Sequence, residues 1–231
     1  MTDMMIGMLF LFIIMLMFFA LKFNQAAAQQ RKTLKDLVGA DDTRKELLKN
    51  IKRSMEKEGV SVTLDTENGI LRLPESILFD SNKSELSDQG KDALNKLAMS
   101  LAKVLPRYTF LQGQDNSGMG PRSPHGIESI FVEGHTDNAG SADLNWRLSV
   151  DRAFHTYQAL IGAQQILAEL QNRNGQPVLS LAGYGKQRPA YPNDTPENKR
   201  LNRRIDLRFI MSPPRVTSKL EDIPEKGGAA P

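Results

Sequence analysis

The chain has 231 residues, a formal net charge of +3 and no Cys. The lack of Cys excludes disulfides, thiolate metal sites, a catalytic thiol and a lipidated N-terminal Cys. So small a charge over this length argues against nucleic-acid binding, which needs a clustered basic face. The apolar residues are unevenly spread, because six of the ten Met and five of the ten Phe lie within residues 1–23. We therefore expect two parts of different chemistry.

Residues 4–21 form an uncharged apolar run. As a helix this run covers about 27 Å, close to the thickness of the hydrocarbon core of a bilayer. A secretory signal peptide is the alternative, since Ala26–Ala28 could form a cleavage site, but the run is long for one and Asp3 precedes it instead of a basic residue. Residues 1–23 are predicted to be a retained transmembrane helix. Its missing cap and missing basic flank indicate an N-terminally truncated start.

Asp3 stands at the edge of this span, and two interpretations are open. It is either an interfacial residue facing water or an ionisable group inside the bilayer, where such groups are usually functional. Asp3 followed by the Met- and Phe-rich stretch of residues 4–12 resembles the transmembrane signature of the B subunits of ion-driven rotary stators, the MotB type. The resemblance implies that Asp3 is the ion-conducting carboxylate of a proton channel.

Residues 24–59 are polar and charged, with a few apolar residues at helical spacing. Leu47, Leu48, Ile51 and Met55 belong to this pattern. We interpret the segment as a solvated helical stalk or linker, with a parallel dimer contact or a short plug helix against the membrane as alternatives. The Gly-Ala-Asp-Asp sequence at 39–42 is expected to interrupt the helix.

Residues 60–211 alternate between strand and helix patterns. The predicted strands cover 60–65, 70–73, 127–133, 178–182 and 204–211, with a hairpin turn at Asn68-Gly69. Helices are predicted after Ser87 as N-cap and from Leu144, the second breaking near Gly162, and 106–126 is read as an irregular loop. This order predicts an α/β (α+β) two-layer sandwich in which helices cover one face of a mixed sheet. Residues 212–231 are predicted to be a disordered tail.

A polar constellation follows the strand at 127–133. Asp137 comes after that strand, and Asn145, Ser149 and Arg152 occupy one face of the next helix. Such a pair suits the zwitterionic end of an amino acid. The protein carboxylate can accept hydrogen bonds from the ligand's ammonium, and the guanidinium can donate two hydrogen bonds to the ligand's carboxylate. A structural Asp137–Arg152 salt bridge is the simpler alternative.

Five ordered segments resemble the OmpA-like peptidoglycan-binding domain, over residues 60–211. They are Phe79–Ser84, Glu133–Asp137, Asn145–Ala153, Gly183–Gly185 and Asn202–Ile205. The resemblance implies that Asp137 and Arg152 bind the diaminopimelate of the peptidoglycan stem. It also implies that Asn82 and Asn145 add hydrogen bonds, and that Thr136 and Arg204 pack or position the site. The 106–126 and 161–176 segments are longer than is usual in the family.

A single apolar helix with an Asp, a stalk and then this domain is the layout of a stator B subunit. The resemblance implies a single-pass inner-membrane protein with a periplasmic C-terminal domain, forming a homodimer and joined by a MotA-type multi-pass subunit. The residues 202–209 and the enlarged middle resemble the B subunit of the Zorya anti-phage system. A flagellar MotB-type subunit and a non-conducting tether between membrane and cell wall are the alternatives.

An enzyme is not expected. His125, His135 and His155 form no helix-spaced pair, and Ser149 has no base at a recognisable spacing. We predict no catalytic residues, no metal site and no cofactor.

Overall fold

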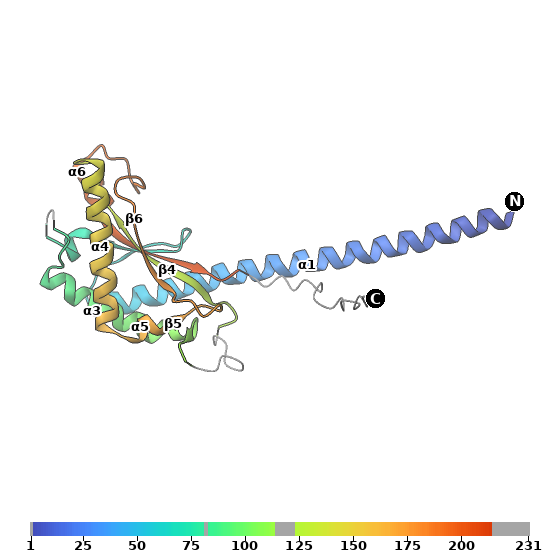
Figure 1. The fold of residues 1–231 in the computed structure, drawn as a ribbon, viewed down its shortest axis with the longest axis horizontal. Coiled ribbons are helices and arrows are strands. Elements are labelled where there is room, and N and C mark those ends of the chain that lie inside the picture. The colour runs from blue at the N-terminus through green and yellow to red at the C-terminus, as the bar shows by residue number, and fades with distance from the viewer. Residues whose placement is uncertain (1, 81–82, 114–122, 214–231) are drawn as a thin grey trace, which may run out of the picture. The chain divides into compact units, whose positions relative to one another are not determined.

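The computed structural model describes residues 2–80, 83–113 and 123–213, with side chains from Met5 onward. The chain divides into two compact units, which are treated separately: 1–38 with 213–231, and 39–212. The secondary-structure elements, shown in Figure 1, are α1 (Thr2–Lys57), β1 (Thr63–Asp65), β2 (Ile70–Pro74), α2 (Glu75–Leu78), α3 (Asp88–Val104), η1 (Leu105–Arg107), β3 (Phe110–Leu111), β4 (Ile127–His135), α4 (Ala142–Ala163), α5 (Ile166–Glu169), β5 (Leu170–Gln171), β6 (Leu179–Gly183), α6 (Pro196–Asn202) and β7 (Arg204–Met211).

The described part of the first unit is helical. The large apolar side chains between Met5 and Phe23 are exposed. Among the described residues, α1 is the one helix that is long and apolar enough to cross a membrane, judged by length and composition. Asp3 lies in this helix, but its side chain falls outside the described atoms, as does nearly all of the predicted tail at 212–231.

Helix α1 continues through residues 39–42, so the predicted break there is wrong. Gly39 has a packing role instead, because a Cβ on it would lie 2.7 Å from Nε2 of His125. Further along the helix, Arg44 pairs with Asp41 and donates a hydrogen bond of 3.0 Å to the carbonyl of Glu67 in the β1–β2 turn.

The second half of the predicted stalk belongs to the folded domain. Leu47, Leu48, Ile51 and Met55 are completely buried and share one hydrophobic core with residues of the strands and of α3. A solvated stalk is therefore wrong for this segment. Burial of these four side chains favours the docked helix, each by about 1.5–3 kcal/mol relative to an exposed position.

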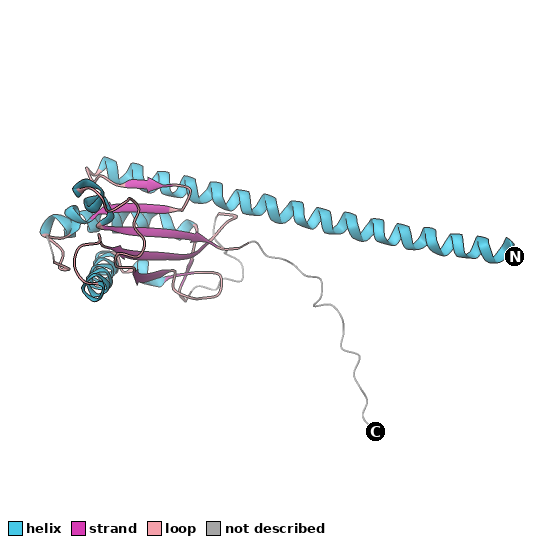
Figure 2. Cartoon of the chain, turned by 90° about the horizontal axis from the view of Figure 1, so that it is seen from above, coloured by secondary structure: helices cyan, strands magenta, loops and turns pink. Residues whose placement is uncertain are grey.

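The main sheet has five strands in the order β1-β2-β7-β4-β6. Neighbouring strands are antiparallel except β4 and β6, which are parallel. Figure 2 shows the strands as one layer beside the helices of the domain. Leu71, Leu73, Val132, Ile205 and Leu207 alternate with polar residues along the three central strands and join the core. The predicted mixed α/β sandwich is confirmed.

Local sequence signals explain most of the elements. Ser87 caps α3 by accepting a 3.0 Å hydrogen bond from the Gly90 amide, as predicted. Gly69 has φ +69°, the left-handed conformation that the β1–β2 turn requires. Strand β7 covers the predicted residues, and α4 ends one residue after Gly162. The short helices α2 and α6 were not expected from the sequence.

Candidate functional site

Two glycines set the position of α4 against the sheet. A Cβ on Gly134 of β4 would lie 2.0 Å from the Ser149 carbonyl oxygen of α4. On β6, a Cβ on Gly183 would lie 2.5 Å from Cγ2 of Val150. Glycine at both positions lets helix and strands approach closely, and this brings the buried face of α4 beside the end of β4.

Arg152 lies on that face and is 2% exposed. Its Nη2 donates to Oε1 of Glu75 at 2.7 Å, and its Nε donates to the Lys83 carbonyl at 2.9 Å. The guanidinium also lies 5.2 Å from the centroid of the Phe79 ring. Burial lowers the pKa of Arg152, although the charge of Glu75 opposes the shift. Glu75 is thus the direct partner that compensates this buried cation.

Asp137 follows β4 and is also buried. Its Oδ1 accepts from the Ala139 amide at 2.9 Å, and its Oδ2 accepts from Nη1 of Arg203 at 2.6 Å. Nε of Arg203 lies 3.3 Å from Oε2 of Glu75. Asp137 and Arg152 therefore belong to one cluster, but each has a different direct partner. We call Glu75, Asp137, Arg152 and Arg203 the four-residue network.

The other predicted site residues fall into three groups. Asn145 is buried beside the network and donates to the Ala139 carbonyl at 2.7 Å, while Thr136 donates to the Asp137 carbonyl at 3.0 Å. Both order the loop that carries Asp137. Asn82 lies outside the described residues. Arg204 joins a different cluster.

That second cluster comprises Asp65, Arg72, Glu133, Asp206, Arg204 and Arg208, and we call it the sheet network. Asp206 accepts from Nε of Arg72 and from Nε of Arg204, both at 3.0 Å. Arg208 donates two hydrogen bonds to Glu133, from Nε to Oε1 at 2.8 Å and from Nη2 to Oε2 at 2.9 Å. Three carboxylates therefore balance three guanidiniums.

His135 lies inside the sheet network without a hydrogen bond at either ring nitrogen. Its ring stacks on Tyr184 at 5.4 Å between centroids. Burial lowers the pKa of His135. Burial would raise the pKa of Glu133, but polar contacts with His135 and Arg208 outweigh it and hold this pKa at about 2.

Glu133, His135 and Asp206 have ligand atoms within 4.8 Å of one another, close enough to surround a cation. Their carboxylate oxygens are already engaged by Arg72, Arg204 and Arg208. A divalent cation would have to displace these guanidiniums inside a buried site, where the added positive charge is costly. The arrangement therefore fits a structural ion-pair cluster.

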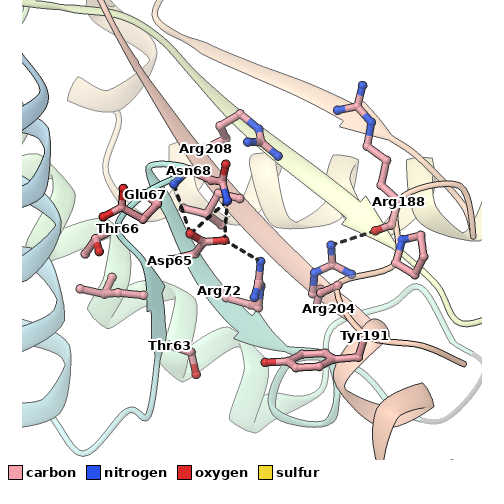
Figure 3. Close-up of a pocket in the computed structure, with 14 residues that line it drawn as sticks. Thr63, Asp65, Thr66, Glu67, Asn68, Arg72, Arg188, Tyr191, Arg204 and Arg208 are labelled. Carbon is pink, nitrogen blue, oxygen red and sulfur yellow. Dashed lines mark hydrogen bonds and ion pairs between the residues drawn. The ribbon is translucent and has the colours of Figure 1, made fainter. Parts of the chain in front are cut away.

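An open hollow of about 690 Å³ lies over the exposed side of the sheet network. Figure 3 shows the β1–β2 hairpin residues Thr63 to Asn68 on one side of it, and Arg188 and Tyr191 on the other. Asn202 holds this second side in place, because its Oδ1 accepts from the Ala190 and Tyr191 amides at 2.8 and 3.0 Å.

The structure brings together Asp137, Asn145 and Arg152, which the sequence predicts as one site, and adds Glu75 and Arg203, which the sequence does not indicate. Arg203 stands within the segment Asn202–Ile205, where the resemblance points to its neighbour Arg204. No local pattern distinguishes the two, because Arg203 lies between α6 and β7, outside the strand that begins at Arg204. Glu75 gives no signal either, since it lies 77 residues from Arg152.

Comparison with known proteins identifies the class of domain. The model of the OmpA family matches residues 78–203, more than half of the chain, and the chain belongs to this family. The chain is 31% identical over 157 residues to the probable lipoprotein YiaD of Escherichia coli K12, covering 68% of this chain and 58% of that one. It is 27% identical over 169 residues to motility protein B of Bacillus subtilis 168, covering 71% and 57%.

A solved structure supports the fold. The crystal structure of a putative MotB-like protein from Desulfovibrio vulgaris matches with a TM-score of 0.51 at 22% identity, over 78% of this chain and 96% of that one. The chain spans less than two thirds of the length of YiaD and of motility protein B.

Proposed function

We propose that the chain is a membrane-anchored peptidoglycan-binding subunit of an ion-driven stator. The observation that carries this proposal is the four-residue network, in which two carboxylates and two guanidiniums meet at one end of the sheet. A zwitterionic group fits such a site, with its ammonium on Asp137 and its carboxylate on a guanidinium. The diaminopimelate of the peptidoglycan stem carries such a group.

Three further facts support the anchoring part. The chain belongs to the OmpA family, it is similar to a lipoprotein and to a motility protein, and α1 has the length and composition of a membrane span. The proposal places the apolar start of α1, residues 1–23, in the inner membrane and residues 39–212 in the periplasm, since the proposed ligand is found there.

Binding to the cell wall is tested by co-sedimentation of the full chain, in detergent, with sacculi of the diaminopimelate type. Asp137→Asn and Arg152→Gln each remove one charge of the network and are expected to weaken binding about tenfold or more. Asp151→Asn and Arg147→Gln are matched controls, because both residues are exposed on the same helix. Unchanged binding in both network variants, with the controls also unchanged, would reject the site.

The ion-conducting part of the proposal rests on Asp3 and on the stator resemblance of residues 3–12. Two copies would pair within a MotA-type multi-pass subunit, and the cell wall would hold them still while Asp3 takes up and releases ions. The Zorya-like resemblance assigns this motor to anti-phage defence. Asp3→Asn should then abolish protection from phage while sacculus binding stays intact. Full protection by this variant would favour a non-conducting tether.

A further inference from the structure

Arg203 is the most accessible member of the four-residue network. Its side chain is 36% exposed, whereas those of Asp137, Glu75 and Arg152 are 10%, 9% and 2% exposed. Its backbone is fixed at the junction of α6 and β7, because its carbonyl accepts from the Glu75 amide and its amide donates to Lys199, both at 3.1 Å. The side chain can therefore move while its Cα stays in place.

In this structure Arg203 occupies the position that a ligand ammonium needs. Its Nη1 lies 2.6 Å from Oδ2 of Asp137, and the other oxygen of Asp137 is engaged by the Ala139 amide. A cation that binds Asp137 must therefore displace Arg203 or share Oδ2 with it. Arg203, a member of the network, therefore competes with the ligand for Asp137.

A second acceptor for Arg203 is already in place. Oε2 of Glu75 is buried without a hydrogen bond, and it lies 3.3 Å from Nε of Arg203. A small movement of the guanidinium converts this long contact into a charged hydrogen bond. Arg152 does not have to move, since it keeps Oε1 of the same carboxylate and the Lys83 carbonyl.

We propose that Arg203 is the specificity residue of the site, acting as an internal cation that a ligand displaces from Asp137 and then binds through its own carboxylate. The inference rests on the proposed function. A ligand with only an amine replaces the Arg203 guanidinium at Asp137 by an ammonium, and Arg203 gains no new partner. A ligand with an ammonium and a carboxylate on one carbon restores a partner to both Asp137 and Arg203. The site therefore favours diaminopimelate stems over lysine stems, which lack that carboxylate.

Two tripeptides form a matched pair for the test: L-Ala-γ-D-Glu-meso-diaminopimelate and L-Ala-γ-D-Glu-L-Lys. Their affinities are measured for the full chain in detergent by titration calorimetry. The unchanged chain should bind the first about tenfold or more tighter than the second, the value of one charged hydrogen bond. Arg203→Gln should lower the affinity for the diaminopimelate peptide and raise the affinity for the lysine peptide. The ratio of the two affinities then falls toward one.

Two further variants keep the test decisive. Arg203→Lys retains a cation that reaches toward Asp137 and should keep the preference for diaminopimelate. Arg200→Gln, an exposed residue of α6 paired only with Glu197 among the described residues, should change neither affinity. The unfolding midpoint of each variant confirms that it is folded.

The outcomes separate the two proposals. If Arg203→Gln weakens both peptides by the same factor, or if Arg203→Lys loses the preference as fully as Gln, Arg203 is not the displaced competitor, while the binding site stands. If the unchanged chain binds neither peptide, the proposed function itself fails. Weaker binding of the diaminopimelate peptide together with tighter binding of the lysine peptide in Arg203→Gln supports the exchange.

Discussion

Two clusters of arginines and carboxylates meet at consecutive residues of the chain. Arg203 belongs to the four-residue network and Arg204 to the sheet network. Both clusters balance their charges, but they differ in how fully their carboxylate oxygens are hydrogen-bonded. Both oxygens of Asp206 and of Glu133 are engaged, whereas Oε2 of Glu75 is buried without a hydrogen bond beside a half-exposed Arg203.

This difference separates a structural cluster from a binding site. A cluster whose carboxylates are all engaged by guanidiniums gains no carboxylate contact from a new ligand and loses its buried pairs when it opens. A cluster with an unused acceptor and an exposed cation can exchange partners at little cost. We therefore propose that the sheet network stabilises the fold and that the four-residue network binds the ligand. The following predictions test that division.

The largest effect is expected at Asp206, which is completely buried and pairs with both Arg72 and Arg204. Asp206→Asn leaves the buried guanidinium of Arg204 without its carboxylate and leaves Arg72 only its longer contact with Asp65, so it should lower the free energy of unfolding by about 3–5 kcal/mol. The single Trp, Trp146 on α4, reports unfolding of the domain by fluorescence in denaturant. A loss no larger than that of the exposed control Glu197→Gln would contradict the structural role.

Glu75→Gln should lower the free energy of unfolding by a smaller amount, about 2–3 kcal/mol, in the same measurement. The variant deprives Arg152 of its carboxylate, but Arg203 can hydrate because it is half-exposed. A cost equal to or greater than that of Asp206→Asn would show that the two networks do not differ in the way we describe.

Gly134→Ala tests whether the close approach of α4 positions the site. The added methyl would meet the Ser149 carbonyl and push α4 away from β4, at a cost of about 1–3 kcal/mol. Sacculus binding should weaken as well, because Arg152 moves with α4. Gly162→Ala is the matched control, since a Cβ there meets nothing within 4 Å. Unchanged sacculus binding by Gly134→Ala would show that binding does not depend on the close approach of α4 to β4.

Acid should destabilise the domain mainly through the sheet network. The pKa of His135 is lowered from 6.5, so the unfolded chain binds a proton that the folded chain does not, and stability falls as pH drops below about 6.5. The pKa of Glu133 is about 2 in place of 4.5, so its contribution is present above pH 4.5 and is lost as pH falls toward 2.

His135→Gln should remove the first of these two pH windows and narrow the second, because contact with His135 also lowers the pKa of Glu133. The unfolding midpoint of each chain is measured between pH 7 and pH 3. An identical slope from pH 6.5 to 5 in both chains would exclude His135 as the cause.

The sequence was informative where spacing along one element determines position. Asn145 and Arg152 share the buried face of α4 because a helix brings residues seven apart onto one side. It was uninformative where partners come from distant segments, as with Glu75 and Arg203, because no local periodicity links them to Asp137. Leu47 and Met55 show a second limit: their helical pattern indicates an apolar face but not which surface covers it.

The most direct test of the central claim is an experimental structure of the full chain with bound L-Ala-γ-D-Glu-meso-diaminopimelate. We predict that the ammonium group lies within hydrogen-bond distance of Asp137 and the neighbouring carboxylate against Arg203, with Arg152 still on Glu75. A ligand bound instead in the hollow beside Arg72 and Tyr191, with the Asp137–Arg203 pair intact, would contradict the account.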